Sequence, residues 1–232
     1  MNKQGNILLA LSGGSPTPTA IASLLLELDI YLPPDRTALV VDHFNYDTVS
    51  ASEKHDVLLL PPPSPPRRDV RNFFGGDGVI AFPRGVAQQL GNASPLLNPI
   101  LRAKSTAYSY NPKEEAETVE DPFATGDQVS LVSAMQARNS ARFTVLGSVE
   151  VLEDAWFDAS VRSLDGKTST TANRNFAKQL TAWTFMELGV LKVGRVEHHL
   201  SSVVEDKAGN DNVTQLGYLN PKIYRVKNDV VS

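Results

Sequence analysis

The chain has 232 residues, of which 41% are hydrophobic and 21% are charged, so it can bury the core of one large domain, or of one domain and part of another. Its 22 basic and 26 acidic residues give a formal charge of −4 with no long run of either sign, which argues against binding to nucleic acid or anionic lipid. Cysteine is absent, which excludes disulfides, thiolate metal sites and thiol nucleophiles.

Neither a signal peptide nor a membrane helix is visible in the sequence. Residues 7–11 are only a short apolar run, whereas a signal peptide needs a longer one. The most apolar stretch, residues 21–32, contains Glu27 and Asp29 and falls short of the roughly 20 apolar residues of a membrane helix. We therefore expect this polypeptide by itself to be soluble.

The first predicted elements form a strand–helix–strand unit. Residues 6–11 are an asparagine followed by five apolar residues, a run that is typical of a parallel strand buried on both faces. Residues 15–18, Ser-Pro-Thr-Pro, supply a hydroxyl cap and a first-turn proline for a helix whose apolar residues recur at helical spacing up to Leu28. Residues 38–41 are the next apolar run, so this order predicts a βαβ unit in an α/β sheet.

Short strands, exposed loops and one hairpin follow in the middle of the chain. Strands are predicted at residues 55–60, 79–82 and 96–102, and exposed loops at residues 61–68, which are rich in proline, and 113–121, which are acidic. Residues 129–136 and 141–147 are predicted to pair as a β-hairpin. Its turn, residues 137–140, contains Asn139, a residue that tolerates the left-handed conformation that such turns often need.

Two helices are predicted next. Residues 151–161 are predicted to be helical, and a stronger helix spans about residues 173–188 and ends at Gly189. One face of this second helix carries Phe176, Leu180, Trp183 and Leu188, and its N-terminal cap is Thr171 or Asn173.

The remaining residues are predicted to complete this domain and to connect it to a second one. Residues 190–196 read as a strand of an α/β domain that spans residues 1–200. Residues 201–220 read as a polar linker, and residues 221–232 as the first strand of a second, β-rich domain. The predicted fold class is thus α/β, with flanking helices, a β-hairpin and the start of a β-rich domain at the C-terminus.

Three groups of residues could carry chemistry, and each has a simpler explanation. Gly13-Gly14-Ser15 lies where backbone amides could cradle a phosphate, but it matches neither the dinucleotide fingerprint nor the P-loop, so a tight turn is favoured. Ser12 and Ser148 are candidate nucleophiles without the Gly-x-Ser-x-Gly elbow. Asp42 with Glu150 or Asp154 could form a carboxylate pair, although the chain is only 7% aromatic, which disfavours a sugar-binding cleft.

Histidines could also converge as metal ligands or as an acid–base pair. They are His43, His55 and the adjacent His198 and His199, in a spacing that matches no ligand motif. Adjacent histidines on a strand point to opposite faces, so hydrogen-bonded or surface histidines are the default reading. We predict no metal site and no cofactor.

Two sequons are present, at Asn92 and Asn212. Both are glycan acceptors only if the chain enters the secretory lumen. Pro95 after the first sequon makes Asn92 the weaker acceptor, while Asn212 lies in the polar linker, where an acceptor would be exposed.

Several segments, in order and in spacing, are similar to the oligosaccharyltransferase 48 kDa subunit family in its fungal form. They are VDHFNYD at residues 41–47, LNPILR at 97–102, QARNSAR at 136–142, GS at 147–148, DAWF at 154–157, WTF at 183–185, GVLKVG at 189–194 and HH at 198–199. The signature positions taken from these segments are Asp42, Asn45, Tyr46, Asn98, Pro99, Gln136, Arg138, Asn139, Arg142, Gly147, Ser148, Trp183, His198 and His199.

The resemblance implies a non-catalytic subunit of the endoplasmic-reticulum complex that N-glycosylates proteins. It implies an incomplete flavodoxin- or amidotransferase-like sheet on the lumenal side, without its first strands, and membrane anchoring only in the full-length parent. Partners would be other subunits, including the catalytic membrane subunit and the ribophorin-type subunit. A carbohydrate- or lipid-diphosphate-binding module and an amidotransferase-like hydrolase remain as alternatives.

The signature residues also have physical explanations that need no active site. Asn98-Pro99 is predicted to fix a turn, Asn139 the hairpin, and Trp183 to anchor the core. Arg138 and Arg142 are predicted to pair with carboxylates. We accordingly expect no catalytic residue among them.

Overall fold

The computed structural model describes residues 5–64, 73–111 and 121–190. The chain divides into a compact unit, Met1–Leu188, and a second unit, Gly189–Ser232, of which only the first two residues are described. The strand predicted at 190–196, the linker at 201–220, the strand at 221–232 and the acidic loop at 113–121 therefore lie almost wholly outside the described residues.

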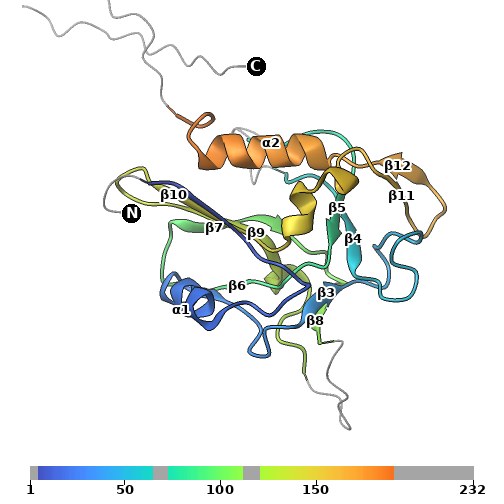
Figure 1. Ribbon diagram of the computed structural model, residues 1–232, viewed down its shortest axis with the longest axis horizontal. Helices are drawn as coiled ribbons and strands as arrows, with labels where there is room; N and C mark the ends of the chain where they lie inside the picture. Colours follow the sequence, from blue (N-terminus) through green and yellow to red (C-terminus); the bar gives the residue numbers. More distant parts are fainter. Residues whose placement is uncertain (1–4, 65–72, 112–120, 191–232) are drawn as a thin grey trace, which may run out of the picture. The chain divides into compact units, whose positions relative to one another are not determined.

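A mixed four-stranded sheet in the order β1-β10-β9-β7 organises the first unit (Figure 1). Its strands are β1 (Ile7–Ala10), β7 (Leu97–Arg102), β9 (Ser130–Gln136) and β10 (Arg142–Leu146). β1 runs parallel to β10, and the β10-β9 and β9-β7 pairs are antiparallel. The predicted α/β class and the predicted hairpin of β9 and β10 are confirmed.

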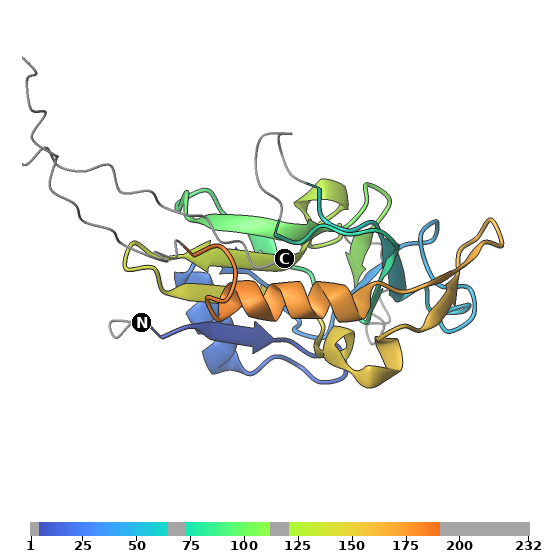
Figure 2. The ribbon, with the colours of Figure 1, turned by 90° about the horizontal axis from the view of Figure 1, so that it is seen from above.

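Two helices cover opposite faces of this sheet, as Figures 1 and 2 show. They are α1 (Thr19–Glu27) and α2 (Asn173–Thr184). Phe143 and Val145 of β10 belong to the core cluster that includes Leu25 of α1. Their neighbour Leu146 belongs to the cluster on α2. Because β10 is buried on both faces, each of its large apolar side chains contributes about 1.5–3 kcal/mol to stability.

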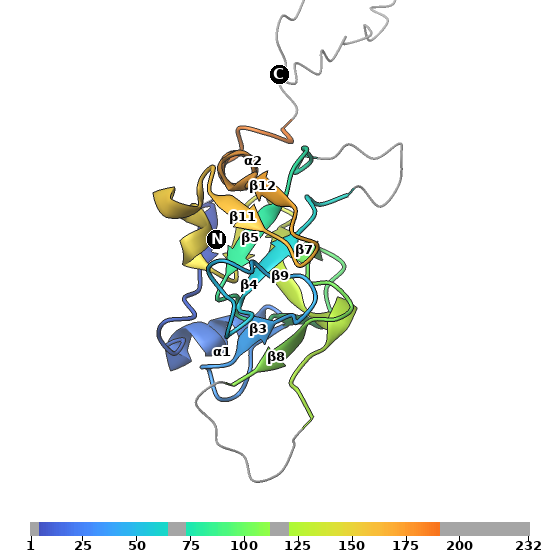
Figure 3. The same ribbon diagram turned by 90° about the vertical axis from the view of Figure 1, so that its right-hand side faces the viewer.

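The remaining strands form four two-stranded pairs. They are β2 (Ile30–Tyr31) with β6 (Gln89–Leu90), β3 (Leu39–Val41) with β8 (Tyr108–Tyr110), β4 (Val57–Leu60) with β5 (Ile80–Pro83), and β11 (Ser160–Arg162) with β12 (Thr168–Thr170). Figure 3 shows the β3-β8 pair apart from the β4-β5 and β11-β12 pairs. Apolar side chains of β4, β5 and β11 share a third core cluster.

The predicted βαβ unit is wrong, although its strand, helix and strand exist. β3 pairs antiparallel with β8 and does not join the main sheet, while β1 takes its parallel partner from the distant hairpin. β1 is also an edge strand and is only half-buried: Ile7 is 42% exposed, while Leu8 and Leu9 pack against the core clusters on opposite faces of the sheet. α1 begins at Thr19 after the N-cap Pro18, and the predicted hydroxyl cap does not form.

The helix predicted at residues 151–161 is also wrong. The segment forms two short 3-10 turns, Val149–Leu152 and Asp154–Trp156, with a further 3-10 turn earlier at Gly126–Gln128. Asp158 then adopts a left-handed backbone with φ of 58°, which no α-helix accommodates, and the chain enters β11.

The second predicted helix begins at Asn173 as predicted, but it ends earlier and lacks the predicted side-chain cap. α2 ends at Thr184, before the predicted Gly189. Its N-cap is Ala172, and no side chain caps it. Asn173 instead bridges to β5, accepting a hydrogen bond from the Ala81 amide at 2.9 Å and donating one to the Ala81 carbonyl at 2.8 Å. One buried amide thereby ties the helix start to the sheet pair.

Candidate functional site

The connection between β3 and β4, residues 42–56, contains a network of hydrogen-bonded polar side chains; we call it the β3–β4 loop. It begins with Asp42, which is 1% exposed. Asp42 accepts hydrogen bonds from the Phe44 and Asn45 amides at 2.8 and 3.1 Å. Its second oxygen accepts from the Asn45 side chain at 3.0 Å and the Thr106 hydroxyl at 2.8 Å. The carboxylate is thus fully occupied in holding the loop.

Asn45 and Tyr46 continue this arrangement. The Asn45 side-chain oxygen accepts from the Lys104 ammonium at 2.6 Å, and its backbone carbonyl accepts from the Leu59 amide at 2.9 Å. Tyr46 forms an isolated bridge with Leu58 and packs against the third core cluster. These residues fasten the loop to β4 and to the segment before β8.

Asp47 shapes the second half of the β3–β4 loop. Burial of its carboxyl raises the pKa, but hydrogen bonds from the Arg162 amide and from Ser50 lower it by more, so the net pKa lies below the usual aspartate value. Because the folded pKa is lowered, the stabilisation is complete above the unfolded pKa of about 3.9 and is lost as pH falls through the folded value.

His43 and His55, twelve residues apart, meet at the two ends of the loop. Their Nδ1 atoms are in direct contact. Nε2 of His43 lies 2.9 Å from the Tyr108 hydroxyl, and Nε2 of His55 lies 3.2 Å from the Ser52 carbonyl oxygen. The Tyr46 ring lies against His55, with 4.0 Å between ring centroids. Two of the four histidines that we considered as converging groups are therefore brought together.

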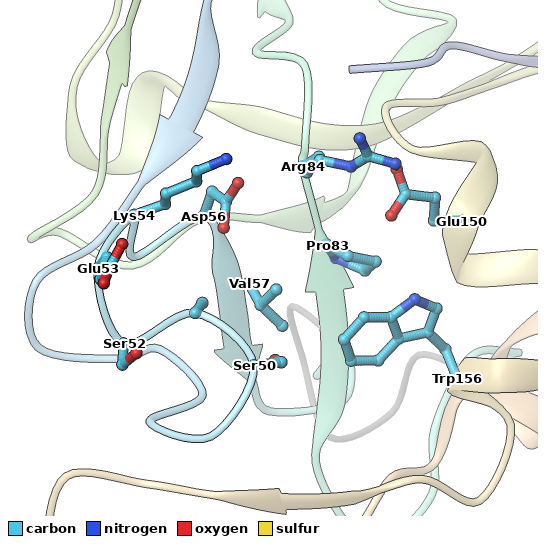
Figure 4. A pocket seen from close by; sticks show the side chains of 11 residues that line it. Ser50, Ser52, Glu53, Lys54, Asp56, Val57, Pro83, Arg84, Glu150 and Trp156 are labelled. Carbon is cyan, nitrogen blue, oxygen red and sulfur yellow. The ribbon is translucent and has the colours of Figure 1, made fainter. Parts of the chain in front are cut away.

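The same loop forms one wall of a pocket of about 340 Å³ (Figure 4). The loop contributes Ser50, Ala51, Ser52, Glu53, Lys54 and Asp56, and the rest of the lining is Val57, Pro83, Arg84, Glu150 and Trp156. In Figure 4 the Trp156 ring stands beside Pro83, while Lys54 and Asp56 extend from the other side. An aromatic wall with carboxylates and cations around it suits a polar ligand with one apolar face.

An ion pair between Arg84 and Glu150 closes one end of this pocket. The side-chain hydrogen bond to Glu150 raises the pKa of Arg84 above its ordinary value, against the effect of burial.

The Gly13-Gly14 turn packs closely against Arg84. Arg84 has a left-handed φ of 44°, and a Cβ on Gly13 would lie 2.4 Å from the Arg84 carbonyl oxygen. Gly13 is therefore required for close packing, and Gly14 donates its amide to Ser12, which fits a tight turn.

The signature residues of β7 and of the hairpin turn have structural environments that differ from those predicted. Asn98 and Pro99 lie inside the edge strand β7 at a register shift, not in a turn; an edge strand tolerates a proline there. Ser140, not Asn139, takes the left-handed φ of 67°, and the Asn139 side chain accepts from the Ala141 amide at 3.2 Å. Arg138 is exposed in this turn.

Gln136 ends β9 opposite Arg142, and Arg142 is almost completely buried under the end of α2. Its guanidinium donates to the carbonyl oxygens of Trp183 and Leu188, the latter at 2.7 Å, and lies 4.6 Å from the centre of the Trp183 ring. Within the described residues, the guanidinium is thus held by main-chain carbonyls of Trp183 and Leu188. Burial lowers the pKa of Arg142 from its ordinary value.

Gly147 and Ser148 follow β10 in a tightly packed bend. A Cβ on Gly147 would lie 2.7 Å from the Leu131 carbonyl oxygen and 2.8 Å from that of Val86. Ser148 is 1% exposed.

The hydrolase alternative needs a histidine beside Ser12 or Ser148. The rings of His43 and His55 contact each other, Tyr46, Tyr108 and the Ser52 carbonyl, so within the described residues no serine–histidine pair supports hydrolysis.

The other predicted positions fall into two groups. Asn92 is exposed between β6 and β7, as an acceptor site would be. His198, His199 and Asn212 lie outside the described residues.

Sequence reasoning missed Thr106, Tyr108 and Arg84 as members of this region, because only the pairing of β3 with β8 and of β4 with β5 brings them to the loop. Neither α1 nor α2, in the described part of the chain, has the length and apolar character that a bilayer crossing requires.

Comparison with known proteins gives one family. The family model "OST48, N-terminal domain" matches residues 1–187. The chain is 31% identical to the dolichyl-diphosphooligosaccharide–protein glycosyltransferase subunit wbp1 of Schizosaccharomyces pombe over 227 residues, covering 98% of this chain and 46% of that protein. It is 33% identical to the corresponding 48 kDa subunit of Danio rerio over 205 residues, covering 84% and 43%. The chain spans about half the length of the curated relatives it matches.

Among solved structures, the mmIFT52 N-terminal domain is similar, with a TM-score of 0.48 and 18% identity over 79% of this chain and 66% of that one.

Proposed function

Because the chain belongs to the OST48 N-terminal domain family, we propose that it is the lumenal α/β part of a non-catalytic subunit of the oligosaccharyltransferase complex. The observation that carries the proposal is the family match over residues 1–187, which covers every element from β1 to α2. In this role it supports transfer of a lipid-linked oligosaccharide to Asn-x-Ser/Thr sites, on the lumenal side of the endoplasmic-reticulum membrane. Its partners are the catalytic membrane subunit and the ribophorin-type subunit.

The way in which the signature side chains are used supports a scaffold role. Both carboxylate oxygens of Asp42 accept hydrogen bonds that hold the β3–β4 loop. The guanidinium of Arg142 donates hydrogen bonds to carbonyl oxygens at and just after the end of α2. Two carbonyl oxygens leave no room for a side chain at Gly147. A catalytic carboxylate or cation must instead be available to a substrate. These groups therefore maintain a shape, which is what a subunit that binds other subunits needs.

We also infer a flavodoxin- or amidotransferase-like ancestry for this fold. Helices on opposite faces of the main sheet and the parallel β1-β10 pair support it, whereas the antiparallel β10-β9 and β9-β7 pairs depart from the parallel sheet of those folds.

Depletion and complementation of the parent protein test the function. We expect depletion to lower the glycosylation of many acceptor proteins at once, seen as faster-migrating glycoproteins, and the wild-type parent to restore it. An Asp42→Ala parent is expected to restore it poorly and to be present at a lower level, because the loop loses its anchor. Normal glycoprotein mobility after complete depletion would contradict the proposal.

The pocket in Figure 4 favours a second candidate, a carbohydrate-binding module. Trp156 offers a ring for stacking on the apolar face of a sugar, and Glu53 and Asp56 offer acceptors for its hydroxyls. Calorimetry with oligosaccharides at millimolar concentration tests it, with Trp156→Ala as the matched variant. Absence of heat with the wild-type chain would exclude this candidate and leave the scaffold role intact.

A further inference from the structure

We propose that His43 and His55 form a binding site for a first-row divalent cation of the zinc, copper or nickel type. The site goes beyond the proposed scaffold function. It rests on the convergence of two imidazole nitrogens whose opposite ring nitrogens are both held by oxygen atoms of the same region.

The ring geometry is that of paired ligands. Nδ1 of His43 faces Nδ1 of His55, and the rings are perpendicular, with an interplanar angle of 84° and 4.7 Å between centroids. Tyr108 holds Nε2 of His43 at 2.9 Å, and the Ser52 carbonyl holds Nε2 of His55 at 3.2 Å. Metal-bound histidines are usually oriented in this manner, because an oxygen partner on the second nitrogen fixes the tautomer and the ring.

The protonation of the pair decides what it can bind. The Ser52 carbonyl can only accept, so in a neutral His55 side chain Nε2 carries the proton and Nδ1 presents a lone pair. When Nε2 of His43 likewise donates to Tyr108, a second lone pair faces the first one. A cation between the two nitrogens satisfies both lone pairs. Without a cation, Tyr108 must donate to His43, so that Nδ1 of His43 carries the proton.

The surrounding structure permits such a site and keeps it open. His43 is exposed, and His55 has a left-handed φ of 51°, a backbone strain of the kind that gathers at functional positions. With metal–nitrogen bonds of about 2.0–2.1 Å, the two nitrogens stand roughly 3.3 Å apart in a tetrahedral site, so metal binding requires the two rings to move apart and to tilt toward the ion.

The described residues hold no cluster of three or more histidine, cysteine or carboxylate ligands. Water or a group from a partner therefore completes the coordination shell. Imidazole nitrogens select zinc, copper and nickel over magnesium or calcium, which prefer oxygen ligands.

The test uses the full 232-residue chain with His198→Gln and His199→Gln as the background, because that adjacent pair can bind metal independently. Calorimetric titration with zinc chloride is expected to show one site per chain. His43→Gln and His55→Gln are each expected to weaken binding at least tenfold, and Tyr108→Phe to weaken it about tenfold because His43 loses its orientation. With Cu²⁺, electron paramagnetic resonance is expected to show two nitrogen ligands in the background chain.

Circular dichroism of each variant shows whether it is folded. If replacing a histidine disturbs the loop, Tyr108→Phe still tests the site, because it retains both histidines. Calcium chloride is expected to give no heat. The proposal is overturned if the background chain binds no zinc up to millimolar concentration, which would leave a hydrogen-bonded histidine pair only. It is also overturned if zinc binding is unaffected by His43→Gln and His55→Gln.

Discussion

Replacement of Arg142 by methionine is expected to loosen α2 from the main sheet. Methionine keeps much of the arginine stem, so it retains apolar packing and removes only the guanidinium. That group donates to two carbonyl oxygens at the C-terminal end of α2 and lies 4.6 Å from the centre of the Trp183 ring. The substitution therefore removes the hydrogen bonds and the cation–π contact that hold α2, while the apolar packing stays in place.

The magnitude follows from these contacts. Hydrogen bonds from a charged donor contribute about 1.5–3 kcal/mol each, and the cation–π contact about 0.5–2 kcal/mol. Burying the guanidinium away from water costs several kcal/mol in the folded state. The substitution removes this cost, which offsets part of the lost hydrogen-bond and cation–π energy. We expect a net loss of about 2–4 kcal/mol in the free energy of unfolding, a range that broken buried networks typically reach.

Urea unfolding followed by far-ultraviolet circular dichroism measures this loss. Arg174→Met is the matched control, because Arg174 forms an exposed ion pair with Asp158 at 2.7 Å, and such pairs contribute only about 0–1 kcal/mol. Arg142→Lys is expected to fall between the two, since it keeps the charge and loses the planar fork. If Arg142→Met costs no more than Arg174→Met, the guanidinium does not hold α2 and the reasoning is refuted.

Three further outcomes are expected. Gly147→Ala should cost about 1–3 kcal/mol in urea unfolding, because its Cβ meets carbonyl oxygens at 2.7 and 2.8 Å, whereas Gly14→Ala meets nothing closer than 3.5 Å and should cost clearly less. Asp47→Asn should be less stable than wild type above about pH 4, and the difference should shrink as pH falls through the lowered folded pKa; a constant difference would argue against the hydrogen-bonded carboxylate. In cells that direct the parent protein to the endoplasmic reticulum, endoglycosidase treatment should remove one glycan fewer from Asn212→Gln than from wild type, while Asn92→Gln should migrate like wild type.

Local pattern was sufficient for the elements whose stabilising partners are close in sequence. The β9-β10 hairpin follows from two apolar runs around a short polar turn, and the apolar face of α2 follows from its spacing. The apolar run of β1 predicts a strand correctly as well, although its partner β10 is distant in sequence.

Pairing between distant segments could not be derived from the sequence. β1 pairs with β10, which is more than a hundred residues away, and β3 pairs with β8. The residues within each strand do not indicate which strand is its partner. The segment around Trp156 shows helical spacing, yet the left-handed Asp158 and the pairing of β11 override it. Tertiary context decides these cases.

The candidate site was predictable only as separate residues. The segment from Asp42 to Asp47 stands out in sequence, but its function as a hydrogen-bonded loop anchor needs Thr106. The meeting of His43 and His55 depends on the path of the whole β3–β4 loop. Arg142 was assigned a carboxylate partner because arginine often has one, whereas the helix end that covers it supplies carbonyl oxygens.

Affinity purification of the full-length parent from detergent-solubilised membranes tests the central claim most directly. We expect the catalytic and ribophorin-type oligosaccharyltransferase subunits to co-purify in stoichiometric amounts, and the Arg142→Met parent to recover less of them than the Arg174→Met parent. Recovery of the parent protein without any oligosaccharyltransferase subunit would contradict its assignment as a subunit of that complex.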